Sequence, residues 1–255
     1  AVASTTIVVP FDDDEAADQV FTEFSDQIAA VVLEPLPANN GLLVQRLSYL
    51  QRLVRRARGV GALLILDEVI SGFRLRYGGY GSEVGIDADL VIFGKVIGGG
   101  MPLGAVVGSP ELMNLLAPNG TVYQAGTLSG NPVSMAAGIA SLRSLRNDPP
   151  YERLEHLGKE LDTAVGSLGR KDVQLQRVGS IVWFYLSSGQ LPRSHDGIDQ
   201  LAVDRFGALH PMLLARGHYL PPSAYEVLFL STQHTPVQVQ NLAADIGALL
   251  DATSP

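Results

Sequence analysis

The sequence predicts an α/β protein in which a mostly parallel sheet, flanked by helices, is followed by a smaller α+β domain. Strand-like apolar runs alternate with helix-like segments over residues 1–148, and this order favours parallel pairing with right-handed crossovers. The segment Asn147-Asp148-Pro149-Pro150 then interrupts the pattern. Hydrophobic residues make up 46% of the chain and charged residues 17%, a balance that supports a sizeable core. We therefore predict domains at residues 1–148 and 149–255.

Strands and helices are predicted to alternate in the first domain. Acidic residues 12–15 open a helix, where negative charge complements the helix dipole. Residues 29–34 and 62–67 are predicted as buried strands, and a helix between them runs from Leu43 to Gly59. Its arginines, at positions 52, 55, 56 and 58, indicate a solvated helix end. A further strand ends at Lys95, another spans 105–108, and small residues at 133–145 form a helix.

The second domain is predicted to combine long amphipathic helices with short strands. The helices occupy residues 151–168 and 198–216, and the strands occupy 173–178, 181–186 and 227–230. The segment Thr235-Pro236-Val237-Gln238 has a capping-box pattern with proline at the first helical position. A last helix is therefore expected from there to about residue 250.

Composition excludes several classes of function. The net charge is −8 and no long basic block occurs, which argues against nucleic-acid binding. The chain has no cysteine, so disulfides, thiolate metal sites and a cysteine nucleophile are excluded. Because we find neither an apolar run of membrane-spanning length nor a signal peptide, we expect a cytoplasmic protein without a membrane partner. The chain begins at Ala1 rather than at methionine, which indicates a processed or truncated N-terminus.

Lys95 and Asp67 are the candidate catalytic residues. Each follows an apolar run, and adjacent parallel strands would carry both to the same edge of a sheet. An apolar setting disfavours a charged ammonium, and a neutral amine forms Schiff bases. An aspartate facing that amine can hold a protonated pyridine nitrogen, so the pair indicates a pyridoxal phosphate site. The alternative is an ordinary surface lysine and an aspartate that merely ends a strand.

Three segments support this interpretation by their order and spacing. They are LILDEVISGFR at 64–74, FGKVIGGG at 93–100 and YQAGTLSGNP at 123–132. Together they resemble the class III aminotransferases, which are fold-type I pyridoxal phosphate enzymes. Within that family the resemblance is strongest to the glutamate-1-semialdehyde 2,1-aminomutases, and it covers only their C-terminal part. The resemblance implies the fold-type I transferase fold, with residues 1–148 as the C-terminal portion of the large cofactor-binding domain.

The resemblance also implies roles for residues near the two strand ends. Lys95 would bind the pyridoxal 5'-phosphate or pyridoxamine 5'-phosphate cofactor and shuttle protons between it and the substrate carbon. Asp67 would keep the pyridine nitrogen protonated so that the ring accepts electrons. Val69, two residues on and expected on the same face of an extended strand, would pack against the ring. A plain core role for Val69 would give the same sequence.

Gly126 and Thr127 lie in a loop before a predicted helix. A hydroxyl and free backbone N–H groups in such a loop can bind phosphate. In the resembled family this threonine reaches the cofactor of the neighbouring subunit, which implies a homodimer with shared active sites. The alternative is that Thr127 caps the helix.

Asn39 and Glu226 are candidates by resemblance. Asn39 matches an asparagine that approaches the cofactor ring, although Asn39-Asn40-Gly41 also reads as an ordinary turn. Glu226 matches a glutamate near the substrate in the aminomutase group and favours an aminomutase over a general aminotransferase. A surface glutamate after a proline-rich loop would look the same. For His234 we expect a structural or capping role.

The chain departs from the family in two respects. It lacks the family's N-terminal part, which holds the helix start around the cofactor phosphate and the aromatic that stacks on the ring. A nicked or split enzyme with a complementary N-terminal fragment is therefore one expectation, since Ala1 falls just after the family's mobile loop. Residues 70–71 and 223–225 also differ from the commoner aminomutase residues, which leaves the substrate open.

Three functions are compatible with the sequence. The first is an aminomutase that moves an amino group from carbon 2 of glutamate 1-semialdehyde and so makes 5-aminolevulinate, a tetrapyrrole precursor. The second is a class III aminotransferase that acts between other small amino and keto substrates, for which no arginine can be assigned as the carboxylate switch. The third is a non-catalytic fragment that pairs with a complete partner.

Overall fold

A computed structural model describes residues 2–253, which form two compact units. The first unit comprises the described residues up to Leu36 together with Gln45–Pro149. The second comprises Pro37–Val44 and the described residues from Pro150 onward. The short segment Pro37–Val44 therefore packs with the second unit although it lies early in the chain. The domain boundary at 148/149 remains our proposal.

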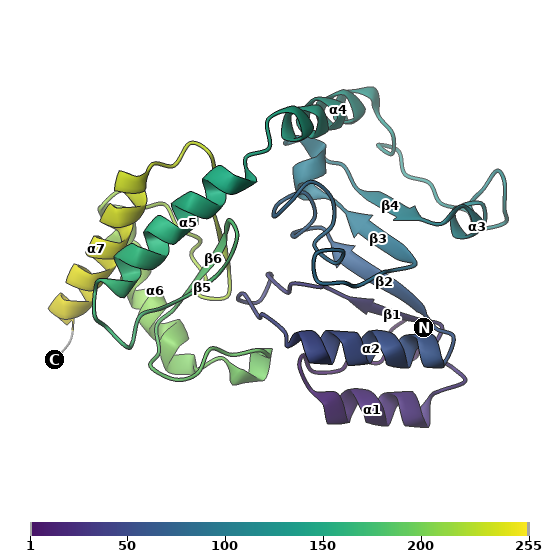
Figure 1. Cartoon of the computed structure of the whole chain (residues 1–255), viewed down its shortest axis with the longest axis horizontal. Coiled ribbons are helices and arrows are strands. Elements are labelled where there is room, and N and C mark those ends of the chain that lie inside the picture. Colours follow the sequence, from purple (N-terminus) through teal and green to yellow (C-terminus); the bar gives the residue numbers. More distant parts are fainter. Residues whose placement is uncertain (1, 254–255) are drawn as a thin grey trace. The chain divides into compact units, whose positions relative to one another are not determined.

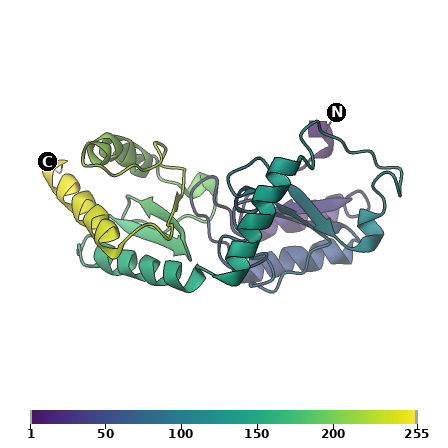
Figure 2. The ribbon, with the colours of Figure 1, turned by 90° about the horizontal axis from the view of Figure 1, so that it is seen from above.

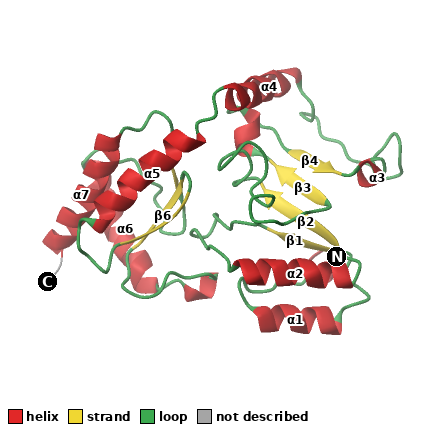
Figure 3. Cartoon of the chain, in the orientation of Figure 1, coloured by secondary structure: helices red, strands yellow, loops and turns green. Residues whose placement is uncertain are grey.

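The first unit is built on a four-stranded mixed sheet in the order β1-β2-β3-β4 (Figures 1 and 3). The strands β1 (Ala30–Leu33), β2 (Leu63–Glu68) and β3 (Leu90–Phe93) run parallel, and β4 (Ala105–Gly108) is antiparallel to β3. A mostly parallel sheet flanked by helices confirms the predicted α/β class. The strands β1 and β4 are the two outer strands of this sheet.

Two helices cover one side of the sheet's first strands (Figure 1). The helix α2 (Leu47–Gly59) contributes Tyr49 and Leu50 to a core that also contains Leu64 and Leu66 of β2. The helix α1 (Asp14–Glu23) packs on α2, and Asp18 accepts hydrogen bonds from Arg52 and Arg56. These bonds lower the pKa of Asp18 to about 2. The arginines thus form a solvated, ion-paired helix face, as the sequence indicates.

Two further helices and two 3-10 turns complete the described part of the first unit. A 3-10 turn η2 (Lys95–Gly98) comes directly after β3, and a short helix α3 (Pro110–Met113) comes after β4. The longer helix α4 (Pro132–Asn147) begins after an N-cap at Asn131. At the N-terminal end a 3-10 turn η1 spans Val2–Thr5.

The second unit places helices around a three-stranded antiparallel sheet in the order β5-β6-β7. The strands are β5 (Gln174–Val178), β6 (Ile181–Tyr185) and β7 (Leu228–Phe229). Helices α5 (Tyr151–Gly166) and α7 (Pro236–Thr253) lie side by side in both views, and α6 (Gln200–Ala215) follows the 3-10 turn η3 (His195–Gly197) (Figures 1 and 2). This arrangement confirms the predicted smaller α+β part.

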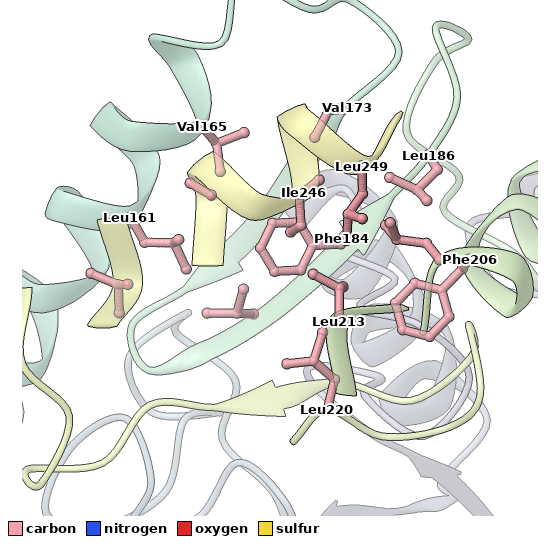
Figure 4. Packing of buried hydrophobic residues seen from close by; sticks show 14 of the residues in the cluster. Leu161, Val165, Val173, Phe184, Leu186, Phe206, Leu213, Leu220, Ile246 and Leu249 are labelled. Atoms are coloured by element: carbon pink, nitrogen blue, oxygen red, sulfur yellow. The ribbon is translucent and has the colours of Figure 1, made fainter. Parts of the chain in front are cut away.

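Alternation along β6 explains how this unit builds its core. Val182 and Phe184 join leucines and valines of the three helices in one buried cluster (Figure 4). Because successive side chains of a strand point to opposite faces, Trp183 and Tyr185 lie on the other face, where they are also buried. Every residue of β6 is buried, which identifies it as the central strand.

Helix starts follow the local sequence signals in one case and not in another. In the predicted capping box, the Thr235 N–H donates to Gln238 Oε1 at 2.9 Å and the Gln238 N–H donates to Thr235 Oγ1 at 3.3 Å. The prediction for α7 is therefore confirmed. The predicted start of α2 at Leu43 is wrong, since the helix begins at Leu47. Leu43 is buried within the second unit instead, and tertiary packing overrides the helical spacing there.

The described residues contain no helix that is both long and apolar enough to cross a membrane.

An ion-paired carboxylate in the second unit predicts a pH-dependent contribution to stability. Arg170 donates to both oxygens of Asp172, at 3.1 and 2.9 Å, and Arg205 donates to the same carboxylate at 2.5 Å. The hydrogen bond from Arg170, followed by that from Arg205, lowers the pKa of Asp172 to about 2 against opposing burial. Since the folded pKa lies below the unfolded one, this stabilisation is present above pH ~4 and is lost as the pH falls toward ~2.

We therefore expect Asp172→Asn to lower the free energy of unfolding near neutral pH and to lose its effect in acid. The difference between wild type and variant should shrink below pH ~4 and disappear below pH ~2. Denaturant unfolding at a series of pH values measures it, with the exposed Asp196→Asn as control. A difference that stays constant across this range would contradict the assignment.

Candidate functional site

Asp67 lies at the carboxyl end of β2, at the edge of the sheet where a site is expected. Along β2 the exposure alternates, so Asp67 shares the less buried face with Leu63 and Ile65. Its Oδ1 accepts a hydrogen bond of 3.0 Å from the N–H of Val69. That bond orients the carboxylate against the turn that follows the strand.

Lys95 lies just beyond the carboxyl end of β3 and opens the turn η2. Its φ of 44° falls in the left-handed region, which is uncommon for a residue with a side chain and recurs at functional positions. The side chain is exposed, so the expected apolar enclosure is not provided by residues 2–253. That expectation is corrected, because the apolar run belongs to β3, which ends before Lys95.

Helix α4 supports the backbone of the turn η2 and the glycine that follows it, here called the lysine turn (residues 95–99), through close contacts that need small residues. Ser141 donates from Oγ to the carbonyl oxygen of Val96 at 3.1 Å. A Cβ on Gly138 would lie 2.8 Å from the carbonyl oxygen of Ile97, and one on Gly99 would lie 2.8 Å from that of Ala137. Helix and turn are therefore in direct backbone contact, and the small-residue character of α4 has a structural reason.

The register of the sheet brings Asp67 and Lys95 to the same edge. In the parallel pair β2–β3, Asp67 is opposite Ile92 and Glu68 is opposite Phe93, which lies two residues before Lys95. Ligands of open α/β sheets bind beyond the carboxyl ends of parallel strands. A carboxylate and an amine at this edge can together hold a ring that carries a basic nitrogen and a carbonyl group.

Val69 is close to the lysine turn but is not part of the strand. The strand β2 ends at Glu68, and Val69 lies in the following turn. The predicted strand geometry for Val69 is therefore wrong. Its side chain packs beside Gly94 instead, where an added Cβ would lie 3.2 Å from Val69 Cγ1.

Gly126 and Thr127 lie in an exposed loop that leads into α4. The N-cap of α4 is Asn131, whose side chain accepts a hydrogen bond of 2.9 Å from the N–H of Ser134. Thr127 therefore does not cap the helix, and the alternative reading of this residue is excluded. The Ser129 N–H donates to the carbonyl oxygen of Gly126 at 2.9 Å and closes a tight turn around Thr127.

Asn39 and Glu226 both belong to the second unit, where their loops are joined. The Gly41 N–H donates to the carbonyl oxygen of Tyr225 at 2.5 Å, and Asn40 Nδ2 lies 2.8 Å from His195 Nδ1. Both Asn39 and Glu226 are exposed. The structure thus brings Asp67, Val69 and Lys95 together in one unit, and the loops of Asn39 and Glu226 in the other.

Sequence reasoning missed two structural residues next to these candidates. Glu68 is buried at 1% exposure beside Asp67, and Trp183 is buried at 2% against the Gly41 turn. A signal for Glu68 was available, since it shares the buried face of β2 with Leu64 and Leu66. Nothing in the sequence pairs Trp183 with a turn far upstream.

Comparisons with known protein families and curated proteins agree with each other. The family model described as "Aminotransferase class-III" matches residues 5–184. A curated glutamate-1-semialdehyde 2,1-aminomutase from Methylacidiphilum infernorum is 43% identical over 244 residues, which cover 94% of this chain and 56% of the relative. The chain thus spans little more than half the length of that relative.

Solved structures show the same fold in transaminases. An omega-transaminase from Sphaerobacter thermophilus matches with a TM-score of 0.87 at 33% identity and covers 96% of this chain and 57% of its own. A structure described as a transaminase with PLP bound matches with a TM-score of 0.82 at 31% identity, over 98% of this chain and 58% of its own.

Proposed function

Because the chain belongs to the class III aminotransferase family, we propose that it forms part of a pyridoxal-phosphate-dependent glutamate-1-semialdehyde 2,1-aminomutase. The observation that carries the proposal is the placement of Asp67 and Lys95 at the ends of adjacent parallel strands. The identity of 43% to a named aminomutase over 94% of the chain supports the reaction. The product would be 5-aminolevulinate, formed without net gain or loss of atoms.

The residues present fit the cofactor by their chemistry. Asp67 offers a carboxylate for a protonated ring nitrogen, and Lys95 offers an amine for an aldehyde carbon. Val69, beside Gly94, would supply apolar surface to the ring. Thr127 with the backbone of Gly126 would donate hydrogen bonds to a phosphate, and Asn39 would approach the ring. When bound, the cofactor supplies the electron sink that allows a proton to leave the substrate carbon.

In this proposal the chain's own residues position groups and move protons. The Lys95 Nζ would act as the general base that shuttles protons between the substrate carbon and the cofactor, from the turn that opens at the carboxyl end of β3. The Asp67 carboxylate would keep the ring nitrogen protonated, and the Val69 N–H holds that carboxylate in place. Glu226 would bind a polar group of the substrate, which has both an amino and a carboxylate group.

Partners are part of the proposal. We propose a homodimer in which Thr127 reaches the cofactor of the neighbouring subunit, which suits its exposed loop. A complementary N-terminal polypeptide would supply the remaining cofactor contacts and would pair with the outer strands of the sheet.

A second candidate is an aminotransferase that acts on another amino and keto substrate. The similarity to an omega-transaminase structure favours it, as do the departures at residues 70–71 and 223–225. The test is turnover of glutamate 1-semialdehyde by the complete protein, that is, this chain together with the proposed N-terminal polypeptide. Turnover is measured with and without an external amino donor. Formation of 5-aminolevulinate without a donor supports the aminomutase. Turnover that requires a donor refutes it in favour of the second candidate.

We expect Asp67→Asn to slow turnover with little change in stability. The amide oxygen can still accept the Val69 N–H, so the turn is retained, whereas a neutral amide cannot stabilise a protonated ring nitrogen. A loss of about a hundredfold or more in kcat is expected, the scale of a lost electrostatic contribution to transition-state stabilisation. Steady-state kinetics and a thermal melt measure both effects, with the exposed Asp26→Asn as control. A variant with unchanged kcat would refute the role of Asp67.

A further inference from the structure

Glu68 is a buried carboxylate that the proposed reaction does not use. It is 1% exposed and lies on the face of β2 that carries Leu64 and Leu66. A carboxylate in such a place is costly unless several donors satisfy it. Glu68 directly follows Asp67 and lies on the opposite face of the same strand.

Three donors from two later segments converge on Glu68. Ser71 Oγ donates to Oε2 at 2.9 Å, the Tyr80 N–H donates to Oε2 at 2.6 Å, and the Gly81 N–H donates to Oε1 at 2.8 Å. The chain from residue 71 to residue 81 is therefore fastened at both ends to the last residue of β2. An added Cβ on Gly79 would lie 2.5 Å from Oε1, so glycine there leaves room for the carboxylate.

The turn that Glu68 holds also packs against the strand end that precedes Lys95. A Cβ added to Gly72 would lie 2.4 Å from Phe93 Cδ1. The ring centroids of Phe73 and Phe93 are 5.3 Å apart, and the two rings pack edge-on. Val69 lies beside Gly94 in the same way. The turn 69–73 thus lies between the Glu68 carboxylate and the two residues before Lys95.

We propose that Glu68 is a positioning residue that sets the geometry of both Asp67 and Lys95 through the turn 69–73. On one side the turn supplies the Val69 N–H that orients Asp67. On the other side it packs against Phe93 and Gly94 and so limits how the lysine turn can move. The inference rests on the proposed function only in that it takes Asp67 and Lys95 as the cofactor-holding pair.

The test compares Glu68→Gln with Glu83→Gln in the complete protein. A glutamine at 68 keeps the shape but directs an NH₂ group at N–H and O–H donors, whereas Glu83 is 60% exposed and pairs with Arg76 at the surface. Hydrogen exchange is read at the Ile97 and Gly99 amides, which donate within the lysine turn. We expect exchange there to quicken about tenfold or more in Glu68→Gln and to stay unchanged in Glu83→Gln.

A second readout is the yield of borohydride-reduced pyridoxal phosphate adduct on Lys95, which should fall in Glu68→Gln at limiting cofactor. Faster exchange confined to residues 71–81, with wild-type exchange at Ile97 and Gly99, would show that Glu68 fastens only its own loop and would overturn the proposal. If wild type itself forms no adduct, the proposed function fails, while the exchange data still decide the role of Glu68.

The milder variant Ser71→Ala decides the matter if Glu68→Gln does not fold. It removes one of the three donors and leaves the carboxylate with the Tyr80 and Gly81 amides. Faster exchange at Ile97 and Gly99 in this variant supports the positioning role. Wild-type exchange at both amides, in a variant whose own turn exchanges faster, overturns it.

Discussion

Lys95→Ala should leave no reducible cofactor adduct on the polypeptide and should abolish turnover. The lysine amine is the group that would bind the cofactor aldehyde and move the substrate proton, and alanine can do neither. General acid–base groups contribute at least about 10²-fold to the rate, and we expect kcat to fall by more than this factor. Intact-mass analysis after borohydride reduction measures the adduct directly.

The fold should survive this substitution because Lys95 is exposed and supports no core contact. Its turn is held by backbone contacts to α4, including the bond from Ser141 to the Val96 carbonyl oxygen. Alanine retains a Cβ, so the cost of the positive φ at this position is little changed. A thermal melt close to that of wild type is therefore expected.

Lys171→Ala provides the matched control for the adduct. It removes another exposed amine, from the second unit, and wild-type adduct yield is expected. An adduct that persists in Lys95→Ala, or one that disappears in Lys171→Ala, would remove Lys95 from the site. Peptide mapping of the reduced wild-type protein should place the added mass on residues 94–100.

Trp183→Ala should destabilise the second unit more than other single substitutions discussed above. Trp183 is 2% exposed, and its Nε1 donates to the carbonyl oxygen of Ala224 at 2.7 Å. Truncation of a buried tryptophan typically costs about 3–5 kcal/mol in the free energy of unfolding. The lost hydrogen bond also leaves a buried acceptor without its donor. Chemical denaturation measures the loss.

The same substitution should loosen the loops of Asn39 and Glu226. A Cβ added to Gly41 would lie only 2.7 Å from Cζ2 of the indole ring. Gly41 also has a positive φ of 79°, so the ring and the backbone conformation both require glycine there. Without the ring, the bond from the Gly41 N–H to the Tyr225 carbonyl oxygen loses its support. Faster hydrogen exchange at the Gly41 amide is the expected sign.

Tyr219→Ala is the matched control, since it removes another aromatic ring of the second unit that is 90% exposed. Its effect should stay within about 0.5 kcal/mol, as is usual for surface positions. A loss below about 1 kcal/mol in Trp183→Ala would contradict the packing described above. Wild-type exchange at Gly41 would contradict the link between the ring and the loops.

Local sequence patterns predicted most elements because the pattern and the fold agree there. The apolar run before Asp67 became β2, and the capping box at Thr235 became the start of α7. The predicted strand order also carried Asp67 and Lys95 to one edge of the sheet, since parallel strands end on the same side. Glycine and proline marked the ends of helices such as α2 with little error.

The errors concern features that the residue pattern of a single segment does not determine: where a strand ends and what covers a side chain. Leu43 has helical spacing but is buried within the second unit, and Val69 continues the apolar pattern of β2 but lies in a turn. Lys95 follows an apolar strand, yet its own side chain is exposed. Periodicity describes a segment by itself and does not show which segment covers it.

The sequence by itself determined the fold class, the order of the elements and the family resemblance, because these depend on local spacing and on short motifs. Only the tertiary structure decided that Glu68 fastens the segment 71–81, that α4 supports the lysine turn, and that Trp183 lies against Gly41. Most of these contacts join residues that are far apart in the chain, such as Ser141 and Val96. Their energy comes from burial and from satisfied hydrogen bonds, and both exist only once the chain has folded.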